Sequence, residues 1–229
     1  MFRKNLLIFT ALAFAGATAI ATAQDEVAFR GNGTTVWGKH ARMTVVTESA
    51  RSYRTTNVAP SGLVTIFNNI GGKYPQGVYW CCTGYDIIGP AQGEQWMATA
   101  FTPSANHTVT RIEVAVGYLL GTNGVVLSLN DDNNGVPGKA LKSWNALGLP
   151  SFGCCALVVK SDGSGIPIRA GKQYWVVLST NSHESDTVAA WNLNDTDQVD
   201  FVTAATYTNK QWSAFQMSPG LAFAVKGSN

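Results

Sequence analysis

The sequence predicts an all-β protein: an antiparallel β-sandwich, jelly-roll-like in type, that follows an N-terminal extension. Three observations predict this class. From Leu63 onward, apolar and polar residues alternate with a period of two, which is the pattern of half-buried strands. Turn sequences such as Gly-Thr-Asn-Gly and Asp-Gly-Ser-Gly separate these segments. Patterns typical of helices are almost absent, so we expect many short strands.

Residues 1–23 have the pattern of a secretory signal peptide. Two basic residues, Arg3 and Lys4, precede an apolar run that ends near Ile20, and a small-residue A-x-A exit follows. A buried N-terminal helix is the alternative interpretation. The run is too short for a comfortable membrane span, and no later segment approaches the ~20 apolar residues that a span needs. We therefore expect the mature chain to be secreted or periplasmic, without a membrane span.

The charge balance argues against some classes of partner. Without Arg3 and Lys4, the 16 Lys and Arg residues fall to 14, which equals the 14 Asp and Glu residues, so the mature chain is formally neutral. A neutral surface argues against nucleic acid or an anionic membrane as a partner. Charged residues make up 13% of the chain, well below the ~25% of average globular proteins. This composition is typical of a turn-rich exported β protein.

The four cysteines occur as two adjacent pairs, Cys81-Cys82 and Cys154-Cys155. Neighbouring Cα atoms lie ~3.8 Å apart, below the ~4.4 Å that disulfides usually require, so a bond within either pair would be strained. We therefore predict two disulfides between the pairs, with the connectivity left open, because exported proteins are oxidised. Zinc binding is the alternative, although adjacent cysteines lack the usual ligand spacing.

The strand pattern divides the remaining chain into an extension and one domain. Residues 24–62 are irregular and predict one or two added strands, whereas residues 63–229 show no repeat or linker and predict a single sandwich. In TVTRIEVAVGY, apolar residues occupy one face, and Arg111 and Glu113 are expected on the solvent side. GKALKSWNAL favours a further strand or an irregular edge. Other segments with a strand pattern are TIFNNI, QWMATAFT, VVLSLN, ALVVK, QYWVVLS, VAAWNL, FVTAATY, QWSAF and LAFAVK.

The polar stretch NDDNNGVPG, residues 130–138, has two interpretations. It is not an EF-hand, because Leu141 stands where that loop needs a bidentate Glu. The main interpretation is a turn, since Asn and Asp tolerate left-handed backbone and Gly135 supplies positive φ. The alternative is a looser calcium site, with calcium as the one cofactor considered and oxygen ligands from Asn130, Asp131, Asp132 and Asn134.

The order of several segments resembles a family of exported bacterial domains. VVLSLNDDNNGVPGKALKSW, FGCCALVV, IPIRAGKQYWVVLS, AAWNLN and LAFAVKG follow one another in the order of the choice-of-anchor domains, in particular the R type. The most specific motifs are D-x-N-G-x-P-G at residues 132–138 and A-G-x-x-Y-W at residues 170–175. The resemblance covers residues 63–229 and implies an exported β-sandwich without an established enzyme activity. Members often end in a sorting tail, which this chain lacks after its last predicted strand, so we expect free release.

Catalytic motifs are absent from the sequence. The three histidines, His40, His107 and His183, stand in no recognisable motif, and no nucleophile elbow, zinc-protease motif or phosphate loop occurs. A glycoside hydrolase needs two carboxylates facing each other across a cleft. No pair is singled out by spacing among Glu94, Glu113, Asp132, Glu184 and Asp186. We therefore expect no enzyme activity, with a glycan hydrolase as the weaker alternative.

Binding is the better supported class of function. The chain has seven tryptophans, and aromatic rings provide flat apolar platforms for sugars. Trp191 stands beside Asn192 and Asn194, so an aromatic ring and hydrogen-bonding side chains occur together. Tyr207 and Trp212 would join this site if FVTAATY and QWSAF form a hairpin. The alternative is that these rings are ordinary core packing, as we expect for Trp96 and Trp175.

The sequence thus predicts a secreted, non-catalytic extracellular or envelope-associated β-sandwich protein that binds an extracellular polysaccharide or matrix component. The alternative is a structural or adhesive surface protein without a small ligand. The ligand and the oligomeric state stay open.

Overall fold

The computed structural model of the chain describes residues 28–30, 33–37, 40–46, 62–70, 83–153, 157–194 and 202–229. These residues form antiparallel β-sheets with two short 3-10 helices, η1 (Pro90–Gln92) and η2 (Ser182–Glu184), which confirms the predicted all-β sandwich class. No helix within the described ranges is long and apolar enough to cross a membrane. The predicted signal peptide, residues 1–23, lies outside the described residues.

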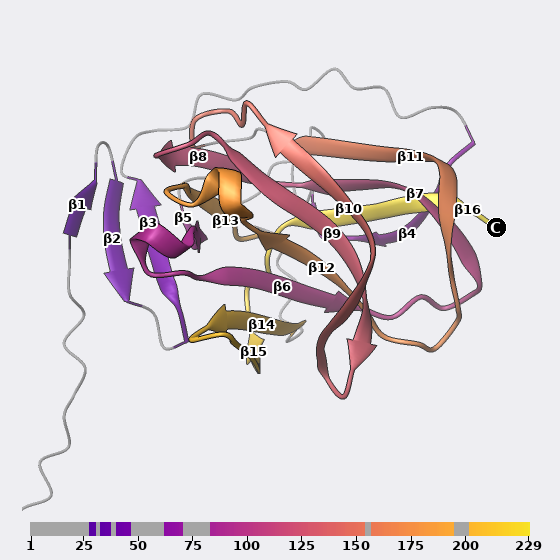
Figure 1. Ribbon diagram of the computed structural model, residues 1–229. Helices are drawn as coiled ribbons and strands as arrows, with labels where there is room; N and C mark the ends of the chain where they lie inside the picture. The colour runs from indigo at the N-terminus through magenta and orange to yellow at the C-terminus, as the bar shows by residue number, and fades with distance from the viewer. Residues whose placement is uncertain are drawn as a thin grey trace, which may run out of the picture.

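Sheet 1 forms one layer of the sandwich, in the strand order β10-β9-β12-β6-β14-β15. All of its neighbouring strands are antiparallel. Figure 1 shows β6, β9 and β12 in front of β4, β7 and β16 of the other layer. The strands of sheet 1 are β6 (Trp96–Phe101), β9 (Gly124–Asn133), β10 (Val136–Leu147), β12 (Tyr174–Ser179), β14 (Val202–Thr208) and β15 (Gln211–Met217).

Two further sheets form the second layer. Sheet 2 has the order β1-β2-β3-β5-β13-β8, and sheet 3 has the order β11-β7-β16-β4. The strands of sheet 2 are β1 (Ala28–Arg30), β2 (Gly33–Trp37), β3 (Arg42–Val46), β5 (Thr83–Ile88), β8 (Val116–Leu120) and β13 (Val188–Asn192). The strands of sheet 3 are β4 (Val64–Asn68), β7 (His107–Val114), β11 (Val158–Ile168) and β16 (Phe223–Ser228).

Sheets 2 and 3 meet at Ala115, where β7 ends and β8 begins. The Ala115 amide donates to the carbonyl of Ala222 (3.1 Å), and the Asn192 amide donates to the carbonyl of Ala115 (2.8 Å). The Ala222 amide in turn donates to the carbonyl of Asn192 (2.8 Å). These bonds join the end of β13 to the segment before β16, so the two sheets form one bent layer opposite sheet 1.

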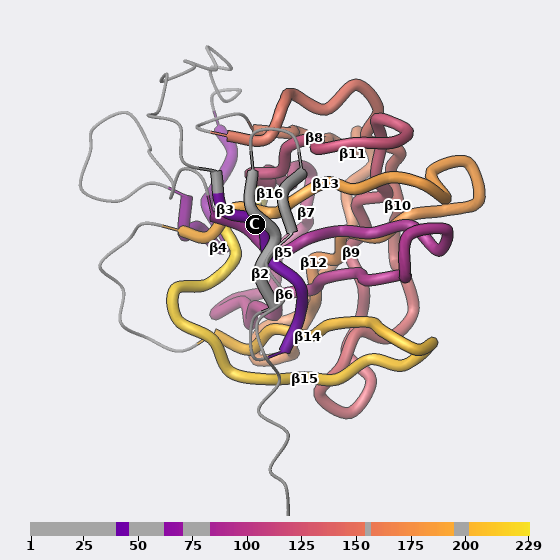
Figure 2. The backbone as a smooth tube through the Cα atoms, turned by 90° about the vertical axis from the view of Figure 1, so that its left-hand side faces the viewer, coloured from indigo at the N-terminus to yellow at the C-terminus, as the bar shows by residue number. Residues whose placement is uncertain are grey.

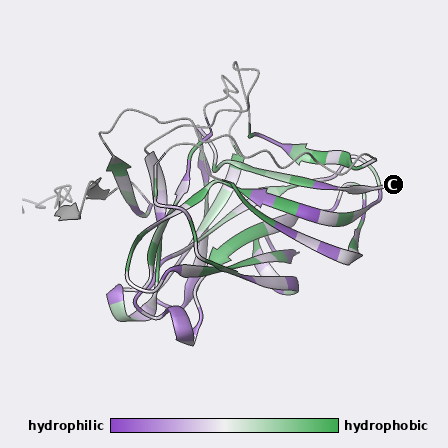
Figure 3. Ribbon diagram, turned by 90° about the horizontal axis from the view of Figure 1, so that it is seen from above, coloured by the Kyte–Doolittle hydropathy of each residue, from purple (hydrophilic) through white to green (hydrophobic). Residues whose placement is uncertain are grey.

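The main hydrophobic core lies between the two layers. Sheet 1 contributes Leu127 and Val176, sheet 2 contributes Ile87 and Trp191, and sheet 3 contributes Phe223, all of which are fully buried. Figure 3 shows hydrophobic and hydrophilic residues alternating along many strands, with hydrophilic residues gathered in the loops. This alternation is the expected pattern of sheets whose inner faces form a core.

The strand interpretation of several segments is confirmed, with two corrections. GKALKSWNAL lies in β10, and the described residues of FVTAATY, 202–207, form the β14–β15 hairpin with QWSAF. TVTRIEVAVGY is not one strand, because Ala115 divides it into β7 and β8. The prediction that Arg111 and Glu113 face solvent is wrong. Both side chains are buried on the outer face of sheet 3, where Glu113 Oε1 accepts hydrogen bonds from Arg111 Nε (2.6 Å) and Lys226 Nζ (2.9 Å).

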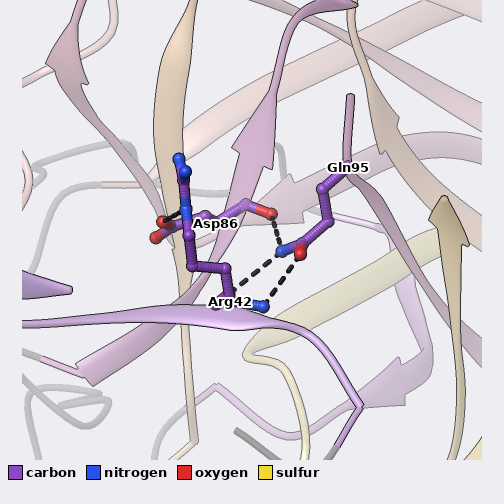
Figure 4. Close-up of polar contacts among 3 residues, drawn as sticks. All are labelled: Arg42, Asp86 and Gln95. Atoms are coloured by element: carbon purple, nitrogen blue, oxygen red, sulfur yellow. Dashed lines mark hydrogen bonds and ion pairs between the residues drawn. The ribbon is translucent and has the colours of Figure 1, made fainter. Parts of the chain in front are cut away.

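The described part of the predicted extension joins sheet 2 through β3, which pairs with β5. A buried polar cluster fixes this junction, as Figure 4 shows. Arg42 Nε bonds the Asp86 carboxylate (2.9 Å), while the amide of Gln95 bonds the backbone of both residues, accepting from Arg42 N (2.8 Å) and donating to Asp86 O (2.8 Å). Three short strands, β1 to β3, therefore occur where one or two were predicted, and they continue the sandwich.

Candidate functional site

The outer face of sheet 1 carries an unusual set of side chains. Successive residues of a strand point to opposite faces, and Met97 and Phe101 of β6 point into the main core. Trp96, Ala98 and Ala100 therefore lie on the outer face. A small apolar cluster, separate from the main core, forms there from residues of β6, β12 and β14: Ala98, Ala100, Trp175, Val177 and Ala205.

Three aromatic residues cross this face from β6 to β15 and are named here the aromatic row: Trp96, Tyr207 and Trp212. Tyr207 lies opposite Trp96 on one side and opposite Trp212 on the other. The rings of Trp96 and Tyr207 stack with centroids 4.2 Å apart and planes 8° apart, and Trp212 is tilted against Tyr207 at 5.3 Å. All three side chains are only partly buried. The row therefore presents aromatic surface to solvent.

Small residues beside the row make room for one large buried ring. Trp175 lies directly opposite Ala100, and Val177 opposite Ala98, in the β12–β6 pairing. Trp175 is fully buried, and Trp212 of the aromatic row packs against the same cluster. Because alanine leaves space above the sheet, the indole of Trp175 fills this space and supports the row from one side.

The carboxylate of Asp132 holds the Trp175 ring in place. Asp132 Oδ1 accepts hydrogen bonds from Trp175 Nε1 (2.8 Å) and Gln173 Nε2 (2.8 Å), and Oδ2 accepts one from the Gly135 amide (3.1 Å). Partial burial acts to raise the pKa of Asp132, but the hydrogen bonds from Trp175, Gly135 and Gln173, with the charge of Lys172, lower it overall.

The β9–β10 hairpin bends toward this outer face. Its two-residue turn has positive φ at both Asn134 (54°) and Gly135 (85°), as a type I′ turn requires. Strands β10 and β15 stand at opposite edges of sheet 1, yet some of their Cα atoms come within 8 Å of each other. Figure 2 shows the hairpin tip near β15 at the bottom of the molecule. Sheet 1 is therefore curled around the cluster that contains Trp175.

The turn interpretation of residues 130–138 agrees with this geometry, whereas the four-residue calcium site does not. Adjacent strand residues point to opposite faces, so Asp131 does not share a face with Asn130 and Asp132. The side chain of Asn130 is already bonded to Ser128 Oγ and to the carbonyl of Gly138. Among the described residues, no group of three or more His, Cys, Asp or Glu side chains could hold a metal ion.

The structure also corrects the predicted platform at Trp191. This ring is fully buried in the main core, and its Nε1 donates to the carbonyl of Ala222 (2.9 Å). Asn192 and Asn194 are each 2% exposed, and Asn192 Nδ2 donates to the carbonyl of Gly153 (3.3 Å). A ring without exposed surface offers no platform, so the packing alternative holds for these three residues.

The predicted hairpin that carries Tyr207 and Trp212 is confirmed, but its partner is Trp96 and not Trp191. The apolar neighbours of Trp96 predict a core position, whereas the structure places this residue on the outer face. The sequence QWMATAF contains a signal for the outer-face position. Trp96 lies two and four residues before Ala98 and Ala100, so it shares their face of the strand and lies opposite the buried Met97.

The predicted disulfides fall outside the described residues, because Cys81, Cys82, Cys154 and Cys155 all lie there. The described residues beside them are nonetheless close together. The Leu193 amide donates to the carbonyl of Thr83 (3.0 Å), and the residue before it, Asn192, the last of β13, donates from Nδ2 to the carbonyl of Gly153. The end of β13 therefore contacts one residue next to each cysteine pair.

Most carboxylates considered for hydrolysis have structural contacts. Glu113 lies in the buried ion cluster, and Glu184 is buried in η2, where it accepts from the Asn181 amide as part of a capping box. Asp186 accepts from the Thr122 amide (3.0 Å), and hydrogen bonds from Thr122 lower the pKa of Asp186. Asp132 is held by Trp175 and its neighbours.

Comparison of the chain with models of known protein families and with curated protein sequences finds no match. The resemblance to choice-of-anchor domains therefore stays a prediction from the sequence.

Proposed function

We propose that this is a secreted, non-catalytic protein, extracellular or attached to the envelope, that binds a polysaccharide or another glycan of the surrounding matrix on the outer face of sheet 1. The observation that carries the proposal is the aromatic row of Trp96, Tyr207 and Trp212. Sugar rings have apolar faces that stack on aromatic side chains, while their hydroxyls need hydrogen-bonding groups nearby. Gln216 and Thr203 lie on the same outer face, and Gln216 is exposed.

The row is suited to a ligand because it is rigid and yet uncovered. Trp96 Nε1 donates to Thr180 Oγ1 (3.1 Å), which fixes the ring at one end of the row. Trp212 packs against the cluster around Trp175 at the other end. A platform that is already ordered loses little conformational entropy when it binds, so little of the stacking energy is offset.

A glycan array with the purified mature protein tests the proposal. We expect saturable binding that Trp212→Ala weakens at least tenfold, which corresponds to ~1.4 kcal/mol, and that EDTA leaves unchanged. Leu147→Ala is the matched control, because Leu147 is an apolar side chain that is 66% exposed and belongs to β10, which β9 and β12 separate from β6. Absence of saturable binding to any glycan would refute the proposal.

Turnover separates binding from hydrolysis. A glycan hydrolase would release product and lose this activity when one carboxylate is neutralised. We expect no product release from a bound glycan, and equal affinity for the Glu94→Gln variant and the parent protein. Product release that this variant abolishes would favour the hydrolase alternative.

A structural or adhesive role without a small ligand is the second candidate function. The exposed free edge of sheet 1 at β15 favours it, because such edges associate with other strands.

A further inference from the structure

The six edge strands of the three sheets differ in how they are protected. These strands are β10 and β15 in sheet 1, β1 and β8 in sheet 2, and β4 and β11 in sheet 3. An edge strand presents unpaired backbone groups that can pair with another chain. Natural proteins protect such edges with charges, prolines, bulges, short length or a covering segment.

The two longest edge strands carry several of these protective features. Strand β10 contains Pro137, Lys139 and Lys142, and its pairing with β9 shifts register twice. Strand β11 contains Asp162 and Pro167, and its pairing with β7 shifts register between Ser161 and Ile166. An ion pair between Lys142 and Asp162 (2.8 Å) also joins these two edges.

The three shorter edge strands are covered or offer few groups. Residues 150–152 run beside β8, where the Tyr118 amide donates to the carbonyl of Pro150 (2.7 Å) and the Phe152 amide donates to the carbonyl of Tyr118 (2.8 Å). Strand β1 has three residues and β4 has five, and the pairing of β4 with β16 is shifted.

Within the described residues, strand β15 lacks a charge, a proline, a bulge and a hydrogen-bonded covering strand, although some Cα atoms of β10 come within 8 Å of it. Its seven residues, Gln211–Met217, include no charge and no proline, and they pair with β14 without a register shift. Its side chains at 211, 213, 214 and 216 are exposed. Within the described part of the chain, no backbone hydrogen bond joins β15 to any segment except β14. Phe215 stacks on His40 at 4.3 Å on the inner side, which holds the strand in place.

The turn before β15 identifies the free backbone groups. Asn209 (φ 51°) and Lys210 (φ 62°) form a two-residue turn, so the flanking pair Thr208 and Gln211 is hydrogen-bonded. Hydrogen-bonded pairs alternate along an antiparallel ladder. The N–H and C=O groups of Trp212, Ala214 and Gln216 therefore point away from β14.

We propose that a second copy of this chain pairs with β15, antiparallel and across a twofold axis. Residues 212, 214 and 216 are symmetric about Ala214, so all of their free groups are satisfied when Ala214 faces Ala214 of the second copy. In this register Trp212 faces Gln216 of the second copy. Every opposed pair is uncharged, so no like charges repel each other, and the smallest side chain stands at the axis.

This pairing would join two copies of sheet 1 into one continuous sheet and place two aromatic rows on the same outer face. Edge pairing between single strands gives a small interface, and small interfaces are weak. We therefore expect a dimer with a dissociation constant on the order of 10–100 µM. The dimer does not depend on glycan binding, although it would give the proposed glycan site two linked copies.

Sedimentation equilibrium of the mature protein tests the pairing directly. Ala214→Lys places two like charges opposite each other at the axis, so we expect the association constant to fall at least tenfold. Ser143→Lys adds the same charge at an exposed position of β10 and is expected to leave dimerisation unchanged. Circular dichroism establishes that both variants fold. A protein that stays monomeric to about 1 mM, or a dimer that Ala214→Lys does not weaken, would overturn the proposal.

A cysteine at the axis provides an independent measurement. Opposed residues of a hydrogen-bonded antiparallel pair have Cα atoms ~5.5 Å apart, which is within the range of a disulfide. We expect Ala214→Cys to give a covalent dimer on a non-reducing gel, and Ser143→Cys to stay monomeric. Equal cross-linking of the two variants would contradict the register. Glycan binding is measured separately on the parent protein, at concentrations far below the dissociation constant of the dimer, because it needs only the monomer.

Discussion

The outer faces of sheets 1 and 2 share one packing arrangement and differ in the side chains next to it. In both, a large ring covers a bed of small residues. Trp175 lies beside Ala98 and Ala100 on sheet 1. On sheet 2 the ring is Phe152, which packs with Ala190 and crosses two glycines of the neighbouring strands.

Gly117 is needed because Phe152 approaches so closely, whereas at Gly84 the nearest atom to an added Cβ is the carbonyl oxygen of Trp191 (2.6 Å). A Cβ added to Gly117 would lie 2.4 Å from the Phe152 Cα atom, and a Cβ added to Gly84 would lie 3.1 Å from its ring. The segment that carries Phe152 is bonded to β8 at Tyr118 and to β13 at Asn192. The backbone around Phe152 and its ring together therefore cover this part of the outer face of sheet 2.

Sheet 1 differs because its buried ring comes from the sheet itself, and the aromatic row beside it is left partly exposed. A large ring packed on small residues thus contributes only to stability on sheet 2, whereas on sheet 1 it also supports the partly exposed aromatic row. Substitutions on sheet 2 should therefore change the free energy of unfolding, whereas substitutions in the row should change binding.

The largest effect is expected from the disulfides that we propose between the two cysteine pairs. Each would close a loop of about seventy residues and stabilise the protein by ~4 kcal/mol in the chain-entropy model. We expect reduction to lower the urea midpoint of unfolding sharply. Mass spectrometry of the unreduced digest should join the peptide with Cys81-Cys82 to the peptide with Cys154-Cys155. Free thiols, or a disulfide between the two adjacent cysteines of each pair, would show that no disulfide joins the two cysteine pairs.

Removal of the ring itself is expected to have the next largest effect. Phe152→Ala leaves a cavity above Ala190, and truncation of a buried Phe typically costs ~3–5 kcal/mol. Equilibrium unfolding in urea measures this loss. Glycan binding of the folded variant is expected to stay unchanged, because sheet 2 lies in the opposite layer. A loss below about 1 kcal/mol would mean that the ring is not a packing element.

On sheet 1, Asp132→Ala tests the anchor of the buried ring. The variant leaves Trp175 Nε1 without its acceptor, and a buried donor left unsatisfied costs ~1–3 kcal/mol. Because folding lowers the pKa of Asp132, its ionised form contributes stability that is present at neutral pH and is lost as pH falls through the acid range. A fall in pH from 7 to about 3 should therefore lower the melting temperature of the parent protein more than that of Asp132→Ala. Equal acid sensitivity would remove Asp132 from this role.

The alternation of residues predicts the strands well but predicts burial only where one face of a strand is exposed. Strand β13 is buried at all five positions, including Asn192. The polar neighbours of Trp191 therefore suggested a surface site, whereas Asn192 bonds the backbone of Gly153 at the place where sheets 2 and 3 meet. Such a contact depends on which segments come together in the fold, and neighbouring residues in the sequence do not reveal it.

Glu113 illustrates the same limit for charged residues. Its alternation with apolar residues correctly predicted a face opposite the core, yet the side chain is buried. The reason is Lys226, which stands on the neighbouring strand β16 and completes the ion cluster with Arg111. The aromatic row was equally hidden, since Trp96 comes from a strand more than one hundred residues before Tyr207, and only the pairing of β6 with β14 brings their rings together.

Tyr207→Phe is expected to have the smallest effect on stability and the most specific effect on binding. Within the described part of the chain, no hydrogen bond to the Tyr207 hydroxyl is seen, so its removal should change the free energy of unfolding by less than about 0.5 kcal/mol. The ring still stacks on Trp96, so a glycan would keep its platform. If the hydroxyl contacts the sugar, affinity should fall about fivefold, which is the effect of losing one hydrogen bond of ~1 kcal/mol. Calorimetric titration with the glycan found on the array measures this change. Unchanged affinity would mean that the glycan contacts only the ring faces. A large loss of stability would mean that the row is covered by other residues, as the outer face of sheet 2 is covered by Phe152.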